Sequence, residues 1–382
     1  MEDTLRKSAR KAALGSLALV GVVSLLAGCA AAPKAGNTTA ATTKFLPCMV
    51  SDAGGFDDKS FNQLGLEGLQ SAAKSIGASY KKAESNADTD YAPNIDSLIA
   101  ANCNLIITVG FNLAAASLAA AKANPDIQFA IIDDGADATG AKDDKGNDKG
   151  DGKVDEPNIK PILFDTAQAA FLAGYASASY SKSGIVGTFG GLQFPTVTIF
   201  MDGFADGVAQ FNKDKSKAVK VVGWDVASQK GSFTGGFAAN DTAKSTAQNL
   251  IDQGADVIFP VGGPIFQSAG AAITDSGKDI ALLGADADVY NTFPQYDKLY
   301  LTSVLKGIDP ATQAVVKASA KQAKGSFDNV AYIGSLKNNG VGIAPFHDFT
   351  SKVGSGLSGE LDKLKADIIS GKLTVKSYLS GS

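Results

Sequence analysis

Short hydrophobic runs alternate with helical patterns along the chain from residue 45 onward. Runs of this length, bounded by Gly, Pro, Asn and Asp, are typical of buried strands, and strands that alternate with helices predict an α/β protein with parallel sheets. Helices fill most of the intervals between these runs. The predicted strands span residues 45–50, 79–84, 105–109, 128–132, 159–164, 185–189, 219–224, 257–261, 280–283, 299–305 and 341–345.

The segment 51–62, SDAGGFDDKSFN, joins the first predicted strand to the clearest amphipathic helix. Ser60 followed by Gln63 predicts a capping box at the start of this helix, and Gly77 predicts its C-terminal cap. Phe61 then takes the first helical position and can lean over the carboxyl edge of the sheet, where open α/β sheets bind ligands. The alternative is a polar connection with an aromatic side chain tucked into the core. The helical spacing is carried by Phe61, Leu64, Gly65, Gly68, Leu69, Ala72, Ala73 and Ile76.

A strand, a glycine turn, a helix and a second strand that ends in aspartate occur twice. Gly110 and Asp133 mark the first copy, Gly263 and Asp286 mark the second, and the two spacings are equal. This repeat predicts two similar Rossmann-like lobes that face each other across a cleft, each with an aspartate at the carboxyl edge of its sheet. Gly262 and Gly263 precede a helix, so backbone N–H groups there can donate to a ligand without obstruction by a side chain.

The N-terminal residues have the composition of a secretory signal. In residues 1–28, four basic side chains precede an uncharged apolar run that is too short to span a bilayer. The run ends in Leu-Ala-Gly-Cys, which resembles a bacterial lipobox in which Cys29 is lipidated and becomes the new N-terminus. Ordinary secretion with Cys29 as a spare thiol is the alternative. Residues 29–44, rich in Ala and Thr, predict a flexible tether.

Charge and motif content argue against several classes of function. The net charge of −4 becomes −6 when residues 1–28, with four basic and two acidic side chains, are removed. Without a basic stripe or a helix-turn-helix, neither nucleic-acid binding nor a repressor function is expected. The single histidine, His347, cannot supply a His-based metal cluster, and neither a P-loop nor a Gly-x-Ser-x-Gly elbow occurs. The Gly-x-Gly-x-x-Gly match at 354–359 follows polar residues instead of a buried strand, so we expect no cofactor.

Two further features, the polar segment 140–156 and the pair Cys48 and Cys103, do not indicate a particular function. Residues 140–156 are dense in Asp, Lys and Gly, but no register fits an EF-hand, so a solvated surface loop is predicted. Cys48 lies in the first strand and Cys103 just before the third, which are neighbours in a 2-1-3 strand order. Both a disulfide and two buried thiols are compatible with this placement.

The segment 51–62 resembles the first signature of the basic membrane protein (BMP) family, the PnrA-like purine nucleoside-binding lipoproteins of ABC transporters. The segments 168–175 (Gln-x-x-Phe-Leu-Ala-Gly-Tyr), 302–306 (Thr-Ser-Val-x-Lys) and 341–346 are also similar to the family, as are positions around Phe200, which we interpret as helix packing. The similarity covers essentially the whole chain after the signal. It departs after Asp286 and at residues 140–156.

This resemblance implies a type I periplasmic-binding-protein fold with two lobes around a hinged cleft. Lobe I is expected to comprise residues 45–165 plus 286–328, and lobe II residues 166–285 plus 329–382. The hinge is expected at three crossovers, near Asp165, Asp286 and Tyr332.

The resemblance also implies a ligand site. A purine base is expected to stack between Phe61 and a second aromatic residue, for which Phe233 is the first candidate and Trp224 and Phe237 are competitors. Stacking of this kind is worth about 1–3 kcal/mol per base and discriminates poorly among purines. The ligand-binding residues expected in addition are Asp52, Asp133, Gly262, Gly263, Asp286 and Lys306, with Asp286 and Lys306 on the ribose hydroxyls and Asp133 on the base or its neighbouring water.

The function implied is that of a substrate-binding lipoprotein of an ABC importer. It is expected to be a monomer outside the cytoplasm, anchored by lipid to the bacterial cell membrane, that delivers purine nucleosides to permease subunits. A nucleoside-cleaving enzyme that uses Asp133 and Asp286 as an acid/base pair is one alternative. A ligand-sensing lipoprotein is another. We expect binding without catalysis, because a sugar site needs carboxylate acceptors at the same positions.

Overall fold

The computed structural model describes residues 44–142, 148–323 and 326–379. The predicted signal sequence, Cys29 and all but the last residue of the predicted tether lie outside these residues. Within the described ranges, no helix has the length and apolar character that a membrane crossing requires.

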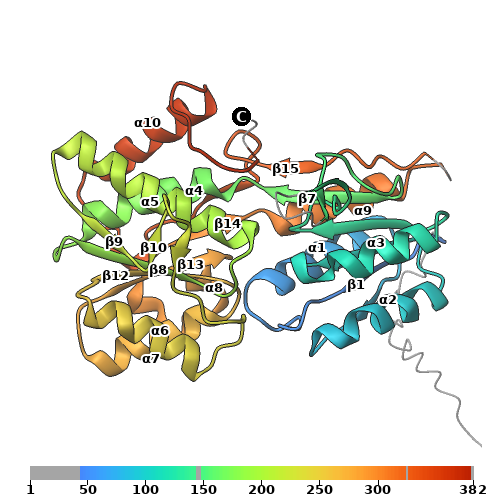
Figure 1. Cartoon of the computed structure of the whole chain (residues 1–382), viewed down its shortest axis with the longest axis horizontal. Helices are drawn as coiled ribbons and strands as arrows, with labels where there is room; N and C mark the ends of the chain where they lie inside the picture. The colour runs from blue at the N-terminus through green and yellow to red at the C-terminus, as the bar shows by residue number, and fades with distance from the viewer. Residues whose placement is uncertain (1–43, 143–147, 324–325, 380–382) are drawn as a thin grey trace, which may run out of the picture. The chain divides into compact units, whose positions relative to one another are not determined.

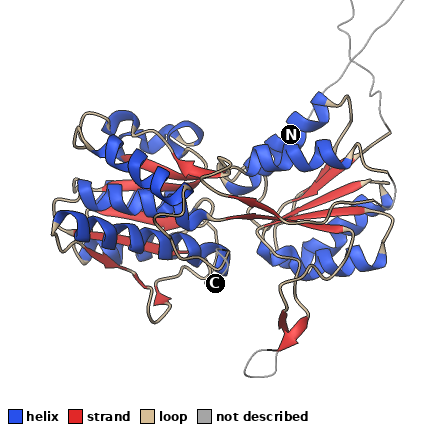
Figure 2. Cartoon of the chain, turned by 90° about the horizontal axis from the view of Figure 1, so that it is seen from above, coloured by secondary structure: helices blue, strands red, loops and turns tan. Residues whose placement is uncertain are grey.

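Two six-stranded sheets organise the described chain, and their first five strands follow the same order (Figures 1 and 2). The two copies of the order 2-1-3-4-5 confirm the predicted pair of Rossmann-like lobes and the expected α/β class. The first sheet runs β2 (Lys81–Ala83), β1 (Pro47–Val50), β3 (Leu105–Val109), β4 (Gln128–Ile132), β7 (Ile159–Phe164) and β15 (Tyr332–Gly334), all parallel. The second runs β9 (Lys220–Val222), β8 (Ile185–Gly190), β12 (Val257–Val261), β13 (Ala281–Asp286), β14 (Tyr300–Lys306) and the antiparallel β16 (Val341–Ile343).

Helices cover both faces of each sheet, as the continuous apolar character of the strands requires. In β1, Met49 packs in the core beside α1 and α9, whereas Cys48 and Val50 point to the opposite face, beside α2. The first sheet is covered by α1 (Phe61–Ser75) with α9 (Ile308–Ser319), and by α2 (Tyr91–Ala100) with α3 (Ala114–Ala123). The second is covered by α4 (Thr166–Tyr180) with α5 (Pro195–Lys215), and by α6 (Asp241–Asp252) with α7 (Ile265–Ser276), while α10 (Leu357–Ile369) packs on α4.

Short elements that the hydrophobic pattern did not predict complete the fold. Within the predicted loop 140–156, β5 (Gly140–Lys142) and β6 (Asp148–Gly150) form an antiparallel hairpin that projects from the first lobe (Figure 2). A second small hairpin pairs β10 (Trp224–Asp225) with β11 (Lys230–Gly231). These strands are rich in Gly, Lys and Asp, so they lack the apolar alternation that marks a strand in sequence.

The chain crosses between the sheets at three places. The first crossover, at Asp165, lies where it was expected, because α4 follows β7 and packs in the second lobe. The second lies at Gly307 instead of near Asp286, because β14 pairs with β13 in the second sheet before α9 returns to pack on α1. The third lies between β15, which pairs with β7, and β16. Two strands therefore differ from the expected lobe division: β14 belongs to the second sheet and β15 to the first.

The start of α1 is capped by a different residue from the one predicted. Ser60 makes no side-chain cap; its Oγ–H donates to the C=O of Ala285 in β13 (2.9 Å) and so links the two lobes. The carboxylate of Asp58 accepts from the backbone N–H groups of Ser60 (3.0 Å), Asn62 (2.8 Å) and Gln63 (3.1 Å). A buried carboxylate can satisfy several of the unpaired N–H groups at a helix start, whereas one hydroxyl accepts fewer.

The predicted glycine cap of α1 is present. Gly77 follows the helix with φ of +66°, a conformation that glycine adopts without strain, and it allows the N–H of Ala78 to bond the C=O of Ala73 (2.9 Å).

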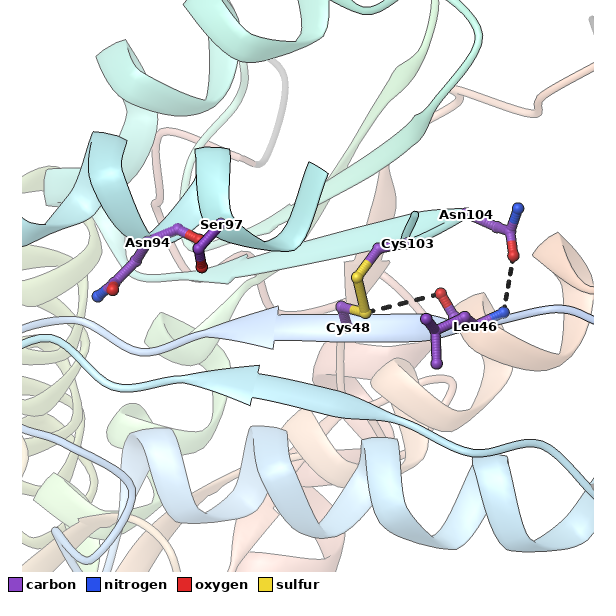
Figure 3. The surroundings of a disulfide bond; sticks show 6 residues. All are labelled: Leu46, Cys48, Asn94, Ser97, Cys103 and Asn104. Atoms are coloured by element: carbon purple, nitrogen blue, oxygen red, sulfur yellow. Dashed lines mark hydrogen bonds between the residues drawn. A yellow bond between two sulfur atoms is a disulfide. The ribbon is translucent and has the colours of Figure 1, made fainter. Parts of the chain in front are cut away.

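Cys48 and Cys103 are joined in a disulfide (Figure 3), which settles the question that the sequence left open. Cys48 lies on β1 and Cys103 precedes β3, the neighbouring strand, with Cα atoms 6.0 Å apart. Beside it, the side chain of Asn104 accepts from the N–H of Leu46 (2.8 Å) and fixes the same end of β1. The bond closes a separation of 55 residues, for which restriction of the unfolded chain contributes about 4 kcal/mol.

Candidate functional site

The carboxyl edges of the two sheets border one cavity, as expected for a ligand site in α/β lobes. The empty space between the two edges is about 590 Å³, part of which is open solvent at the mouth of the cavity. Both lobes contribute to the wall. The lining residues include Asp52, Phe61, Asn62, Gly110, Phe111, Asn112, Asp133, Phe194, Phe200, Phe237, Gly262, Gly263, Asp286 and Lys306.

A buried ionic cluster forms one part of this wall. Lys306, the last residue of β14, places Nζ 2.5 Å from Asp133 Oδ2 and 3.5 Å from Asp286 Oδ1. Asp133 directly follows β4 and Asp286 ends β13, and both have φ of +67°. The repeated motif therefore presents its two aspartates in the same backbone conformation, from opposite lobes, to a single lysine.

The cluster holds more negative than positive charge. Burial alone would lower the pKa of Lys306, but the two carboxylates outweigh it and raise that pKa. Burial raises the pKa of Asp133; Lys306 opposes this shift and Asp286 adds to it. Oδ1 of Asp286 is buried and accepts no hydrogen bond from any described residue. The cluster is therefore suited to a neutral ligand with hydroxyl or N–H donors, and it disfavours anions.

Three aromatic rings surround the ammonium group of Lys306. Its Nζ lies 5.0 Å from the ring centroid of Phe61, 5.2 Å from that of Phe200 and 5.7 Å from that of Phe164. These distances permit cation–π attraction, which is strongest where water is excluded. Phe61 and Phe200 also line the cavity, so a ligand beside Lys306 contacts apolar faces as well as charges.

A second aromatic group lines the cavity. Phe111, which follows the turn at Gly110 in the first lobe, stacks on Phe194 of the second lobe with ring centroids 4.6 Å apart. Phe194 in turn lies 6.2 Å from Phe237. The ring of Phe237 covers Gly262, where an added Cβ would approach it to 2.7 Å. Glycine at 262 is therefore required for this ring to occupy its place in the wall.

Phe233, the first candidate for the second stacking residue, does not line the cavity. Its backbone segment pairs with Gly190, through Thr234 N–H to Gly190 C=O (3.0 Å), and its ring packs edge-on against Trp224 (5.9 Å). The turn at Gly235 then returns the chain so that Phe237 reaches the cavity. Of the three aromatic residues considered from sequence, Phe233, Trp224 and Phe237, only Phe237 lines the cavity.

Asp52 and Asn62 form a fixed polar pair in the wall. Oδ1 of Asp52 accepts from Gly54 N–H (2.8 Å) and from the amide of Asn62 (2.7 Å). That amide also donates to Asp58 (3.1 Å), and its oxygen accepts from Asp52 N–H (3.0 Å), so Asn62 is fully engaged. Burial raises the pKa of Asp52 to about 6, although the hydrogen bonds from Gly54 and Asn62 oppose the shift. The second oxygen of Asp52 faces Gly110 and accepts no hydrogen bond from the part of the chain that the structure describes.

Most of the residues expected from sequence thus meet at one site. Asp52, Phe61, Asp133, Gly262, Gly263, Asp286 and Lys306 line the cavity, and Phe233 does not. Sequence reasoning missed Asn62, Phe111 and Phe194, and it assigned Phe200 to packing alone. A usable signal was present for Phe111 and Phe194, because each stands next to or shortly after a glycine turn at the end of a predicted strand.

Two Rossmann-like lobes joined by three crossovers, with a mixed polar and aromatic cavity between their sheet edges, form a type I periplasmic-binding-protein fold. Solved structures share this fold. The chain resembles an ABC transporter system solute-binding protein from Aeropyrum pernix with a TM-score of 0.73 and 21% identity, over 88% of this chain and 94% of that one. The lac repressor is also similar, with a TM-score of 0.51 and 13% identity over 80% and 93% of the two chains, so the fold alone does not fix the function.

Residues 45–377 match the family described as ABC transporter substrate-binding protein PnrA-like, and the chain belongs to this family. Proteins of this class act outside the cytoplasm. Among its relatives is the ABC transporter nucleoside-binding protein BmpA of Lactococcus lactis, 30% identical over 96% of this chain and 99% of the relative. Basic membrane protein B of Borreliella afzelii is 28% identical over 78% and 80% of the two chains.

Proposed function

We propose that this protein is the binding component of an ABC importer for purine nucleosides, and that it captures them in the cavity between its lobes without chemical conversion. The observation that carries the proposal is the composition of the wall. A buried Asp–Lys–Asp cluster provides donors and acceptors for a sugar, and aromatic rings beside it provide faces for a base. The nucleoside-binding relative from Lactococcus lactis supports this assignment.

We place the ribose at the ionic cluster. Sugar hydroxyls both donate and accept, and Asp286 Oδ1, which accepts no hydrogen bond from a described residue, can accept while Lys306 donates. Asp133 is bonded to Lys306, so we assign it to this sugar end instead of to the base. Hydrogen bonds to charged groups contribute about 1.5–3 kcal/mol each, and more is lost when one buried partner is left unpaired.

We place the base between Phe61 and the ring of Phe237 on the opposite lobe, because Phe194 already stacks on Phe111. Each stacked face contributes about 1–3 kcal/mol with little preference among purines. The second oxygen of Asp52 is then a polar atom that can distinguish one base edge from another, because Asn62 holds the carboxylate in place and has no free donor of its own.

Binding without turnover fits the site better than nucleoside cleavage. A glycosidase needs one carboxyl group free to give a proton and another free to activate water or attack. Here Asp133 and Asp286 both face the same ammonium group. Incubation with inosine should therefore release no hypoxanthine, and release at a rate dependent on Asp133 would favour the enzyme.

We further propose that Cys29 carries the lipid anchor and that the ligand passes to a permease in the same membrane. A sensor that reports to a membrane kinase would use the same cavity. The genes next to this one distinguish the two, since an importer needs permease and ATPase subunits.

Isothermal titration calorimetry tests the proposed ligand. We expect one site per chain that binds inosine or guanosine much more tightly than ribose or hypoxanthine, because each fragment engages only one part of the wall. Ribose bound as tightly as inosine would contradict a base-stacking site.

A further inference from the structure

The one histidine of the chain lies beside the turn that carries Asp286. His347 opens a short 3-10 turn, His347–Phe349, and its Nε2 lies 2.9 and 3.1 Å from the two carboxylate oxygens of Asp288. A carboxylate accepts hydrogen bonds, so Nε2 is the donor in this contact. Asp288 precedes α8 (Val289–Thr292) and is two residues from Asp286.

Neighbours on both elements fix the imidazole. The ring of Tyr290, in α8, stacks on it with centroids 4.0 Å apart and planes 6° apart. The hydroxyl of Tyr290 donates to Asp348 (3.2 Å), which also pairs with Lys298 (2.5 Å). The turn after β13 and the segment around His347 are thus joined by a hydrogen bond, a ring stack and an ion-paired carboxylate.

The segment that carries His347 also holds β14. Ala344 N–H donates to Ser303 C=O (2.9 Å), and Thr302 Oγ–H donates to Ala344 C=O (2.7 Å). His347 itself has φ of +42°, a left-handed conformation that a side chain makes unfavourable and that persists where surrounding contacts fix it. One segment therefore sets the position of the strand that ends in Lys306 and of the turn that follows Asp286.

We propose that His347 is a positioning residue for ligand binding: its N–H bond to Asp288 holds the turn that aims Asp286 into the cavity. Apart from the ion pair with Lys306 Nζ (3.5 Å), Oδ1 of Asp286 has no hydrogen-bond partner among the described residues, so its position also depends on the backbone of this turn. This inference rests on the proposed function, in which Asp286 contacts the sugar of the nucleoside.

Two substitutions separate the hydrogen bond from the ring. His347→Phe keeps the stack on Tyr290 and removes the donor, whereas His347→Gln keeps a donor at a similar reach and removes the ring. Asp348→Ala is the matched control, because it disrupts the contacts of Tyr290 and Lys298 in the same cluster and leaves the His347–Asp288 bond. Each variant is titrated with inosine and with hypoxanthine.

We expect His347→Phe to bind inosine about three- to tenfold more weakly and hypoxanthine unchanged, because one hydrogen bond that orients the sugar contact is lost. His347→Gln should bind inosine within about twofold of the wild type, and Asp348→Ala should keep the wild-type ratio of the two affinities. In the ligand-free protein, hydrogen exchange at amides 287–292 should be faster in His347→Phe than in His347→Gln.

Several results would overturn the inference. Unchanged inosine binding in His347→Phe, or equal loss for inosine and hypoxanthine, would show that His347 is structural only. If the wild type binds no nucleoside, the proposed function fails, and the hydrogen-exchange comparison still decides the role of His347. Equal exchange in the two His347 variants would then rule out positioning through Asp288.

Discussion

Asp52 shows how one buried side chain can set both selectivity and its dependence on pH. Its pKa is raised to about 6 by burial, and its free oxygen faces the proposed base site. Above this pKa the carboxylate can only accept, which suits inosine and guanosine, whose N1 carries a hydrogen. Below it the protonated group can donate to N1 of adenosine.

We therefore expect inosine affinity to rise as the pH increases from 5 through 6 and to level off near 7, a change of about tenfold, since only about a tenth of a group is ionised one unit below its pKa. Adenosine should change in the opposite direction. Calorimetry at several pH values measures both.

The control is Asp52→Asn, which should flatten both profiles. It is needed because burial also raises the pKa of Asp134 to about 6, so another carboxyl group titrates in the same interval. Parallel pH profiles for inosine and adenosine, or profiles that persist in Asp52→Asn, would exclude Asp52 as the group that reads the base edge.

At the scale of elements, the loop between β11 and α6 decides which aromatic residue enters the cavity. Phe237→Ala should weaken all purine nucleosides alike by about 1–3 kcal/mol, because a stacking face is lost. Phe233→Ala is a matched control from the same loop: its ring packs on Trp224, so it should lower the melting temperature and leave affinity nearly unchanged. Calorimetry and thermal melting separate the two effects. Loss of affinity in Phe233→Ala alone would restore the assignment made from sequence.

The side-chain positions in this loop could not be predicted from the sequence, whereas most of the fold could. Hydrophobic runs predicted the central strands of the two sheets, such as β3, β12 and β13, because burial on both faces leaves a continuous apolar signal. The equal spacing of Gly110–Asp133 and Gly263–Asp286 located the ionic cluster, since the carboxyl ends of parallel strands meet at one edge. Which of two nearby aromatic residues faces a cavity depends on turns such as that at Gly235, for which no periodicity exists.

The lobe to which β14 belongs could not be predicted from sequence for a related reason. An apolar run specifies a strand and not its partner, so the pairing of β14 with β13 could not be read from residues 299–305. The cap of α1 was similarly ambiguous, because Asp58 and Ser60 are both good cap residues and only the path of the loop places the carboxylate over the helix start.

At the scale of the whole molecule, closure of the two lobes depends on contacts that span the cavity. Phe111 and Phe194 stack across it, and such a pair contributes about 0.5–1.5 kcal/mol beyond its area burial. Because the stack joins the two lobes, it stabilises the closed form in particular. The hydrogen bond from Ser60 to Ala285 also joins the two lobes and stabilises the same form.

We expect Phe194→Ala to release nucleosides about two- to tenfold faster while association changes little, because the stack must break before the ligand leaves. Stopped-flow displacement measures the release rate.

Phe111→Ala should have a similar effect, and the double variant should release nucleosides little faster than either single variant, since both substitutions remove the same contact. Phe293→Ala removes an aromatic pair with Phe266 inside one lobe, so it should reduce folding stability without faster release. Two results would contradict this role: additive increases of the release rate in the double variant, or a change in selectivity among purines without faster release. Either would show that the two rings contact the ligand separately and do not hold the lobes together.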